Sequence, residues 1–216
     1  MLAANNDALV MVQIGMFAPP WWIEQNPDHE LLCHNGSQYI AIDNEVSLAS
    51  KKFREEAGEV LRLLLRHMKE QSYYNRVFGL KIGGGQSYEW MIRGTGAEQG
   101  PDYSPVSVAG FTEYLKKKYG TEEALQAAWG NSKVTFETAA APGWDERKDF
   151  ANVYSGDADT GYLARNIVDW NLYLNEESTD AFLYYCQIAK EETDNQIIVG
   201  GYNGYLWTSN SYDSQV

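Results

Sequence analysis

One carboxylate in the sequence follows an apolar run and a glycine-rich segment, and aromatic residues stand on both sides of it. Glu89 lies in the stretch 83–90, which reads Gly-Gly-Gly-Gln-Ser-Tyr-Glu-Trp, directly after the apolar run 77–82. An acid beside aromatic rings loses part of its hydration, which raises its pKa and lets it donate a proton near neutral pH, as a general acid must. Glu89 is therefore the predicted catalytic residue. The structural alternative is an ion pair with Arg93, four residues further on.

Aromatic rings cluster at two other points of the sequence. Trp21 and Trp22 follow one apolar run, and Tyr202 and Tyr205 follow another. Flat rings with polar tips suit ligands that are half apolar and half hydroxylated, such as sugars. The predicted sugar-binding residues are the rings of Trp21, Trp22, Trp90, Tyr202 and Tyr205, with Gln86 and Asn203 as hydrogen-bonding partners of the hydroxyls. The structural alternative for each ring is the packing of a loop onto the sheet.

Three apolar runs are typical of buried strands, and helical periodicity separates them. The runs 8–16, 77–82 and 196–201 predict strands. Apolar residues recur every three or four positions in the predicted helices, which cover 47–68, 107–119, 122–129 and 163–188. Ser47 is the predicted N-cap of the first helix. Strand, helix and strand in this order predict a βαβ unit with parallel strands, so the three aromatic segments should meet at the carboxyl edge of one sheet.

Composition limits the classes of partner. The chain has 216 residues, and its 17 Lys and Arg against 30 Asp and Glu leave a net charge of −13. That charge repels phosphate backbones and anionic headgroups, so neither nucleic acid nor a membrane surface is an expected partner. The sequence contains no apolar stretch of the roughly 18 to 20 residues that span a membrane, and its first residues lack the basic region of an export signal. The default expectation is a cytoplasmic protein that binds a carbohydrate.

Metal and thiol chemistry find little support in the sequence. Cys33 and Cys186 are the only cysteines, which excludes a disulfide framework and a zinc site of four thiolates. The segment 28–34 holds two histidines, two acids and a cysteine, but no pair has the spacing of a known ligand motif. No metal and no cofactor are expected.

Several stretches of the sequence have a family likeness. They are 19–22 (PPWW) with 26–28 (NPD), the stretch 83–90 around Glu89, and 111–121 (FTEYLKKKYGT) with 128–130 (AWG). Together these stretches resemble the β-galactosidases of glycoside hydrolase family 42 and their relatives in clan A. The most specific is FTEYLKKKYGT, which is similar to the segment F-x-x-W/Y-L-x-x-K-Y-G-T that follows the fourth strand in that family.

The resemblance implies an α/β fold, namely part of a (β/α)8 TIM barrel, in which the predicted strands are about the third to the fifth of eight. Residues 1–216 would form a single partial catalytic domain with a helical loop insertion at about 94–160. The implied chemistry is retaining hydrolysis of β-galactosides or related glycosides by two carboxylates about 5 Å apart. Glu89 would be the acid/base, and the nucleophile is expected beyond Val216, so the fragment alone would be inactive. Family members usually have, before the acid/base, an Asn that binds the sugar 2-hydroxyl, whereas this chain has Tyr88.

Two other functions are consistent with the same residues. A non-catalytic carbohydrate-binding protein on the same fold would use the aromatic rings for binding and Glu89 as a hydrogen-bond acceptor. An α/β domain of another function would use the rings only to pack its loops. Three parallel strands leave sheet edges unpaired, so the isolated chain is expected to be marginally stable, inactive or homo-oligomeric.

Overall fold

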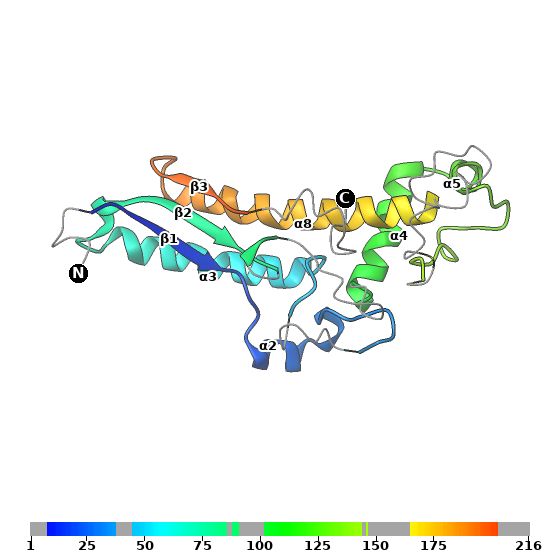
Figure 1. Cartoon of the computed structure of the whole chain (residues 1–216), viewed down its shortest axis with the longest axis horizontal. Helices are drawn as coiled ribbons and strands as arrows, with labels where there is room; N and C mark the ends of the chain where they lie inside the picture. The colour runs from blue at the N-terminus through cyan, green and yellow to red at the C-terminus, as the bar shows by residue number, and fades with distance from the viewer. Residues whose placement is uncertain are drawn as a thin grey trace.

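The computed structural model describes residues 8–37, 45–85, 88–90, 102–143, 146 and 165–202. A parallel sheet lies on two long helices, and further helices pack at the far end of one of them (Figure 1). The strands are β1 (Val10–Gly15), β2 (Val77–Gly83) and β3 (Ile198–Gly200). The α-helices are α2 (Pro20–Gln25), α3 (Lys51–Lys69), α4 (Pro105–Tyr119), α5 (Glu122–Trp129) and α8 (Arg165–Glu192), and the short 3-10 helices are η1 (Pro27–His29) and η2 (Tyr74–Arg76).

The three strands pair in chain order, and both pairs are parallel. Ile14 of β1 lies opposite Ile82 of β2, and Gly79 of β2 lies opposite Ile198 of β3. Because α3 lies between β1 and β2 in the chain, the predicted βαβ unit is confirmed. Parallel pairing also brings the carboxyl ends of the strands to one edge of the sheet, which is where the candidate residues follow the strands.

Helices α3 and α8 cover one face of the sheet. Leu61 and Leu65 of α3 and Ile188 of α8 are each 1% exposed. They belong to one core with Leu80 and Ile82 of β2. The apolar spacing of three and four residues along α3 produces this stripe, and it leaves most of the charged residues of the helix outside the core.

Helix α3 begins one turn later than the sequence predicted. Its N-cap is Ser50, whose hydroxyl accepts a hydrogen bond from the Phe53 N–H at 3.1 Å. The predicted cap, Ser47, is wrong, because its hydroxyl donates to the buried carboxylate of Asp102.

The opposite face of the sheet is uncovered in the part of the chain that the structure describes. Met11 is 47% exposed and Ile198 62% exposed. Gln13 follows Met11 at the two-residue spacing that places side chains on the same face of a sheet, and its register partner on β2 is Lys81. This face therefore combines apolar and polar side chains.

A second core lies where α4 and α5 pack on the N-terminal half of α8 (Figure 1). Its completely buried side chains are Phe111, Leu115, Leu125 and Trp170. As predicted, Gly120 caps the C-terminus of α4, with φ +72°, and Thr121 caps the N-terminus of α5. Helix α8 is 28 residues long, yet within the described ranges neither it nor another helix combines the length and apolarity of a membrane span.

Candidate active site

Glu89 lies in a tight loop that follows β2 at the carboxyl edge of the sheet. The backbone N–H of Trp90 donates to the carbonyl of Gly84 at 2.8 Å, and its indole Nε1 donates to the carbonyl of Ile82 at 2.9 Å. From α8, the hydroxyl of Ser178 donates to the carbonyl of Trp90 at 2.6 Å. Three hydrogen bonds therefore anchor the residue that directly follows Glu89.

Glycines are required where this loop folds back on the sheet. A Cβ at Gly83 would lie 2.7 Å from the ring of Tyr88, and a Cβ at Gly84 would lie 2.6 Å from the indole of Trp90. Gly15, the register partner of Gly83, would also place a Cβ 2.7 Å from the Tyr88 ring. The close approach of two rings thus explains why side chains are absent here.

The backbone is strained on both sides of Glu89. Tyr88 has φ +63° and Trp90 has φ +33°, a conformation that costs a non-glycine residue about 1–3 kcal/mol and persists only where the surroundings impose it. Glu89 is half-buried and its Oε2 is shielded from solvent. The carboxyl group is therefore held in a partly dehydrated position after β2, where the sequence placed it, and its catalytic role stays a prediction. Gln86 and Arg93 lie outside the described residues.

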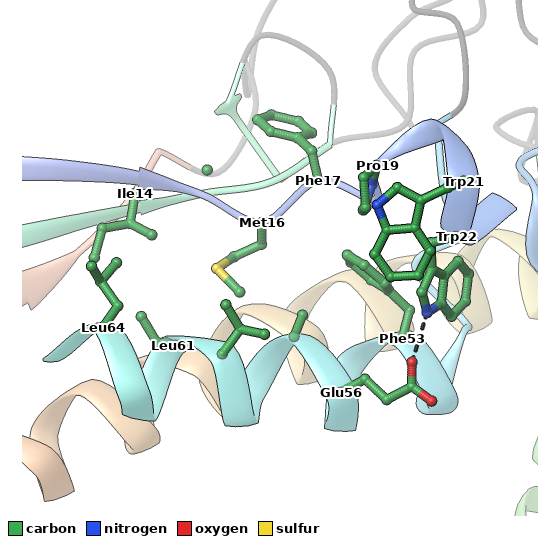
Figure 2. A pocket seen from close by; sticks show the side chains of 13 residues that line it. Ile14, Met16, Phe17, Pro19, Trp21, Trp22, Phe53, Glu56, Leu61 and Leu64 are labelled. Carbon is green, nitrogen blue, oxygen red and sulfur yellow. Dashed lines mark hydrogen bonds between the residues drawn. The ribbon is translucent and has the colours of Figure 1, made fainter. Parts of the chain in front are cut away.

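Phe17, which sequence reasoning did not select, contacts the residue next to Glu89. The rings of Phe17 and Tyr88 meet edge to face with their centroids 4.7 Å apart. Figure 2 shows Phe17 on the side of the chain away from α3, whereas Met16 points toward α3. Successive side chains of an extended chain point to opposite sides, so this alternation, continued beyond the end of β1, would have predicted opposite directions for Met16 and Phe17.

The prediction that Trp90 stacks on sugar is wrong in the described structure. Trp90 is only 2% exposed. Its ring packs against Phe182 and Tyr185 of α8, at centroid distances of 5.6 and 5.8 Å. Trp90 therefore holds the loop on the core, and it leaves no open ring face for a ligand.

Trp22 also packs inside the protein, which corrects a second predicted sugar contact. It is 4% exposed, its ring lies 5.1 Å from that of Phe53, and its Nε1 donates to Glu56 at 2.6 Å. Trp21 is 57% exposed, and it stands with Trp22 on the α3 side of the chain (Figure 2). The two indoles therefore do not join Phe17 beside Tyr88.

Trp21 and Trp22 line one end of an apolar groove of about 480 Å³ between β1 and α3. The other end is formed by Ile14 of β1 and Leu64 of α3 (Figure 2). Glu56 is the only charged residue among those that line the groove in the described part of the chain.

Tyr202 follows β3 at the same edge of the sheet as Glu89. It is 60% exposed, and the Nζ of Lys81 lies 3.7 Å from its ring centroid. Lys81 is the register partner of Gly200, two residues before Tyr202. Tyr202 therefore remains a candidate for ligand binding, while Asn203 and Tyr205 lie outside the described residues.

Two buried carboxylates lie elsewhere in the structure. Asp102 accepts hydrogen bonds from the hydroxyl of Ser47 and, at 2.9 Å, from the N–H of Ser104. Burial raises the pKa of Asp102, and burial together with the charge of Asp102 raises the pKa of Glu45 to about 7. Among the described residues no three His, Cys, Asp or Glu side chains are grouped so that they could hold a metal ion. The hydrogen bond between Ser47 and Asp102 joins the segment before α3 to the start of α4.

The chain matches a known protein family over nearly its whole length. A sequence model of glycoside hydrolase family 42, described as β-galactosidase, matches residues 2–213. The chain belongs to glycoside hydrolase family 42. A comparison with curated proteins gives no match.

Solved structures share the fold of this family 42 chain. The β-galactosidase from the psychrophilic Marinomonas ef1 has a TM-score of 0.63 at 18% identity, with 94% of this chain and 28% of that chain covered. The β-galactosidase from Bacillus circulans sp. alkalophilus has a TM-score of 0.63 at 15% identity, with 91% and 27% covered. The catalytic domain of β-amylase from Paenibacillus polymyxa has a TM-score of 0.66 at 16% identity, with 84% and 44% covered. The chain thus spans less than a third of the length of these two β-galactosidases.

The most specific family 42 motif of the chain serves packing in the described structure. Lys118 ends the basic run of the motif, and its Nζ donates to the carboxylate of Asp169 at 2.9 Å. The indole of Trp129 donates to the same carboxylate at 2.8 Å. These contacts join α4 and α5 to α8, so the described motif residues stabilise the packing of these helices and do not contact Glu89.

Proposed function

We propose that this family 42 chain is part of the catalytic domain of a glycoside hydrolase that cleaves β-galactosides or related glycosides with retention of configuration. Glu89 is the acid/base of the reaction. The observation that carries the proposal is the position of Glu89, half-buried after the carboxyl end of β2 and flanked by two residues with positive φ. A general acid must be held in a fixed orientation toward the oxygen atom that it protonates, and a strained, anchored loop restricts the carboxyl group in this way.

In this reaction Glu89 first protonates the glycosidic oxygen as the bond to the leaving group breaks, while a second carboxylate attacks the anomeric carbon. Glu89 then removes a proton from the water that hydrolyses the glycosyl-enzyme intermediate, and so it returns to its starting state. We assign the second carboxylate to polypeptide beyond Val216, about 5 Å from Glu89 as retention requires.

The uncovered surfaces of the chain support a larger (β/α)8 barrel. Among the described residues, β1 and β3 are edge strands. Next to β1, Val60 of α3 is 66% exposed and lines the apolar groove. Next to β3, Leu183 of α8 is 55% exposed. Neighbouring strand and helix units of a barrel would pair with both edges and bury these side chains. This supports our proposal that residues 1–216 are one partial domain, for which we keep the expected helical insertion at about 94–160.

The test is the hydrolysis of aryl and alkyl β-galactosides by the complete protein and its Glu89→Gln variant. We expect loss of the acid to slow hydrolysis of the alkyl glycoside by about 10² to 10⁴-fold. The loss should be smaller for a nitrophenyl glycoside, whose leaving group needs little protonation, and azide should restore turnover of the nitrophenyl glycoside by replacing water. The matched control is Glu55→Gln on the exposed side of α3, which should change neither rate. Full activity of Glu89→Gln on the alkyl glycoside would contradict the proposal.

A further inference from the structure

The ring of Tyr88 occupies a place that two neighbouring strands leave empty for it. Gly15 and Gly83 are the last register pair of β1 and β2. The Cε1 of Tyr88 approaches Gly15, and its Cδ1 and Cβ approach Gly83, so closely that a Cβ on either glycine would lie 2.7 Å from the tyrosine. One edge of the ring thus rests on backbone from both strands.

Packing alone does not account for this arrangement. Tyr88 takes up a left-handed backbone conformation, with φ +63°, and yet 40% of the residue stays exposed. A residue that served only the core would gain more by burial, as Trp90 does at 2% exposure two positions later. Strain that is imposed on a solvent-exposed side chain at a strand end is a feature of functional sites.

Phe17 limits the directions in which the Tyr88 ring can move. The two rings are almost perpendicular, at 85°, with their centroids 4.7 Å apart. With one edge on the glycines and Phe17 against it, the Tyr88 ring is a rigid platform on the residue directly before Glu89. A rigid ring loses little conformational entropy when it binds a ligand.

We propose that Tyr88 is a substrate-positioning residue that determines which sugar binds at Glu89. This inference rests on the proposed function, and it names the substrate class as hexopyranosides with a continuous apolar face. In a galactopyranoside the hydrogens on carbons 3, 4 and 5 share one face, because the 4-hydroxyl is axial on the other face. An aromatic ring stacks on such a patch of C–H groups, whereas in a glucopyranoside the patch is interrupted.

The experiment measures the affinity of methyl β-galactoside and methyl β-glucoside by titration calorimetry. It uses the complete protein in the Glu89→Gln background, where turnover does not disturb binding. Tyr88→Gly removes the ring and tolerates the left-handed backbone, without the sugar-binding amide that Asn would introduce at this position, and Tyr88→Phe keeps the ring. Tyr73, an exposed tyrosine before η2, offers the matched control Tyr73→Gly. Circular dichroism and thermal unfolding establish that each variant is folded.

We expect Tyr88→Gly to weaken galactoside binding by roughly tenfold, which corresponds to about 1.4 kcal/mol. It should reduce the preference for galactoside over glucoside, while Tyr88→Phe and Tyr73→Gly retain both. Unchanged galactoside affinity in a folded Tyr88→Gly variant overturns the inference, and so does a starting protein that binds neither glycoside. The Glu89 proposal has its separate rate measurement, so sugar binding that depends on Tyr88 without hydrolysis that depends on Glu89 would refute only the catalytic role.

Discussion

The phenolic hydroxyl of Tyr119 lies 2.6 Å from the Oδ2 of Asp169 and donates a hydrogen bond to it. Tyr119 ends α4, and Asp169 is completely buried in the first turns of α8. The same carboxylate accepts from Lys118 and Trp129. One buried carboxylate therefore connects three helices. Because a buried carboxylate needs several hydrogen-bond donors, the motif supplies them from Lys118, Tyr119 and Trp129.

Removal of this carboxylate should unfold α4 and α5 first. Asp169→Ala leaves Lys118 and the donors of Tyr119 and Trp129 without their acceptor, and the loss of one partner from a buried charge network costs about 3–5 kcal/mol. Urea unfolding and hydrogen exchange of α4 and α5 measure the effect. The control is Lys116→Ala, because the ion pair of Lys116 with Glu113 is exposed and contributes less than about 1 kcal/mol. Equal stability of the two variants would contradict the role of Asp169.

Gly84→Ala should loosen the loop that carries Glu89. The new methyl group would lie 2.6 Å from the Trp90 indole, and overpacking of this kind costs about 1–3 kcal/mol. Thermal unfolding measures the loss of stability, and the rate of glycoside hydrolysis by the complete protein should fall as well, because the displaced Trp90 moves Glu89. Gly200→Ala in β3 is the control, since no heavy atom lies within 4 Å of its added methyl group. A Gly84→Ala protein as stable as Gly200→Ala would show that the indole can move freely.

Sequence patterns predicted the three strands, their parallel order and the four longer helices, because periodicity is a local property. They missed α2 and placed the cap of α3 at Ser47 instead of Ser50. They also placed Glu89, since a carboxylate after a buried strand must lie at the sheet edge. The roles of Trp22 and Trp90 could not be predicted in this way. The partners of Trp90 lie on α8, about 90 residues later in the chain, and Trp22 faces Phe53 because α2 turns toward α3. Aromatic enrichment shows that rings gather near strand ends, but it does not show which side of the strand they occupy.

The stability of the chain should depend on pH through Glu45. Burial and the nearby charge of Asp102 raise the pKa of Glu45 from its ordinary value of 4.5 to about 7. The folded protein thus binds this proton more tightly than the unfolded chain. The contribution of the bound proton to stability is complete below about pH 4.5, and it is lost as the pH rises through about 7.

Glu45→Gln removes this titration without a change of shape. The variant and the parent protein should be equally stable at about pH 4.5, and the variant should be more stable by roughly 3 kcal/mol at about pH 8. Urea unfolding at both pH values measures the difference, and Glu55→Gln, exposed on α3, should show none. A constant difference at all pH values would mean that the carboxyl group of Glu45 does not titrate in this range.

Val60→Lys should reduce self-association of the isolated chain but destabilise the complete protein. Val60 is 66% exposed and lines the apolar groove beside the β1 edge. On the isolated chain the lysine interrupts an exposed apolar surface, so sedimentation should show less self-association. The net charge changes only from −13 to −12. In the complete protein a neighbouring barrel unit would bury the same position, so the lysine should lower the melting temperature by several degrees. Glu55→Gln makes the same change of charge on the same helix and should affect neither measurement. A Val60→Lys variant that leaves the melting temperature of the complete protein unchanged would show that no barrel unit covers the groove.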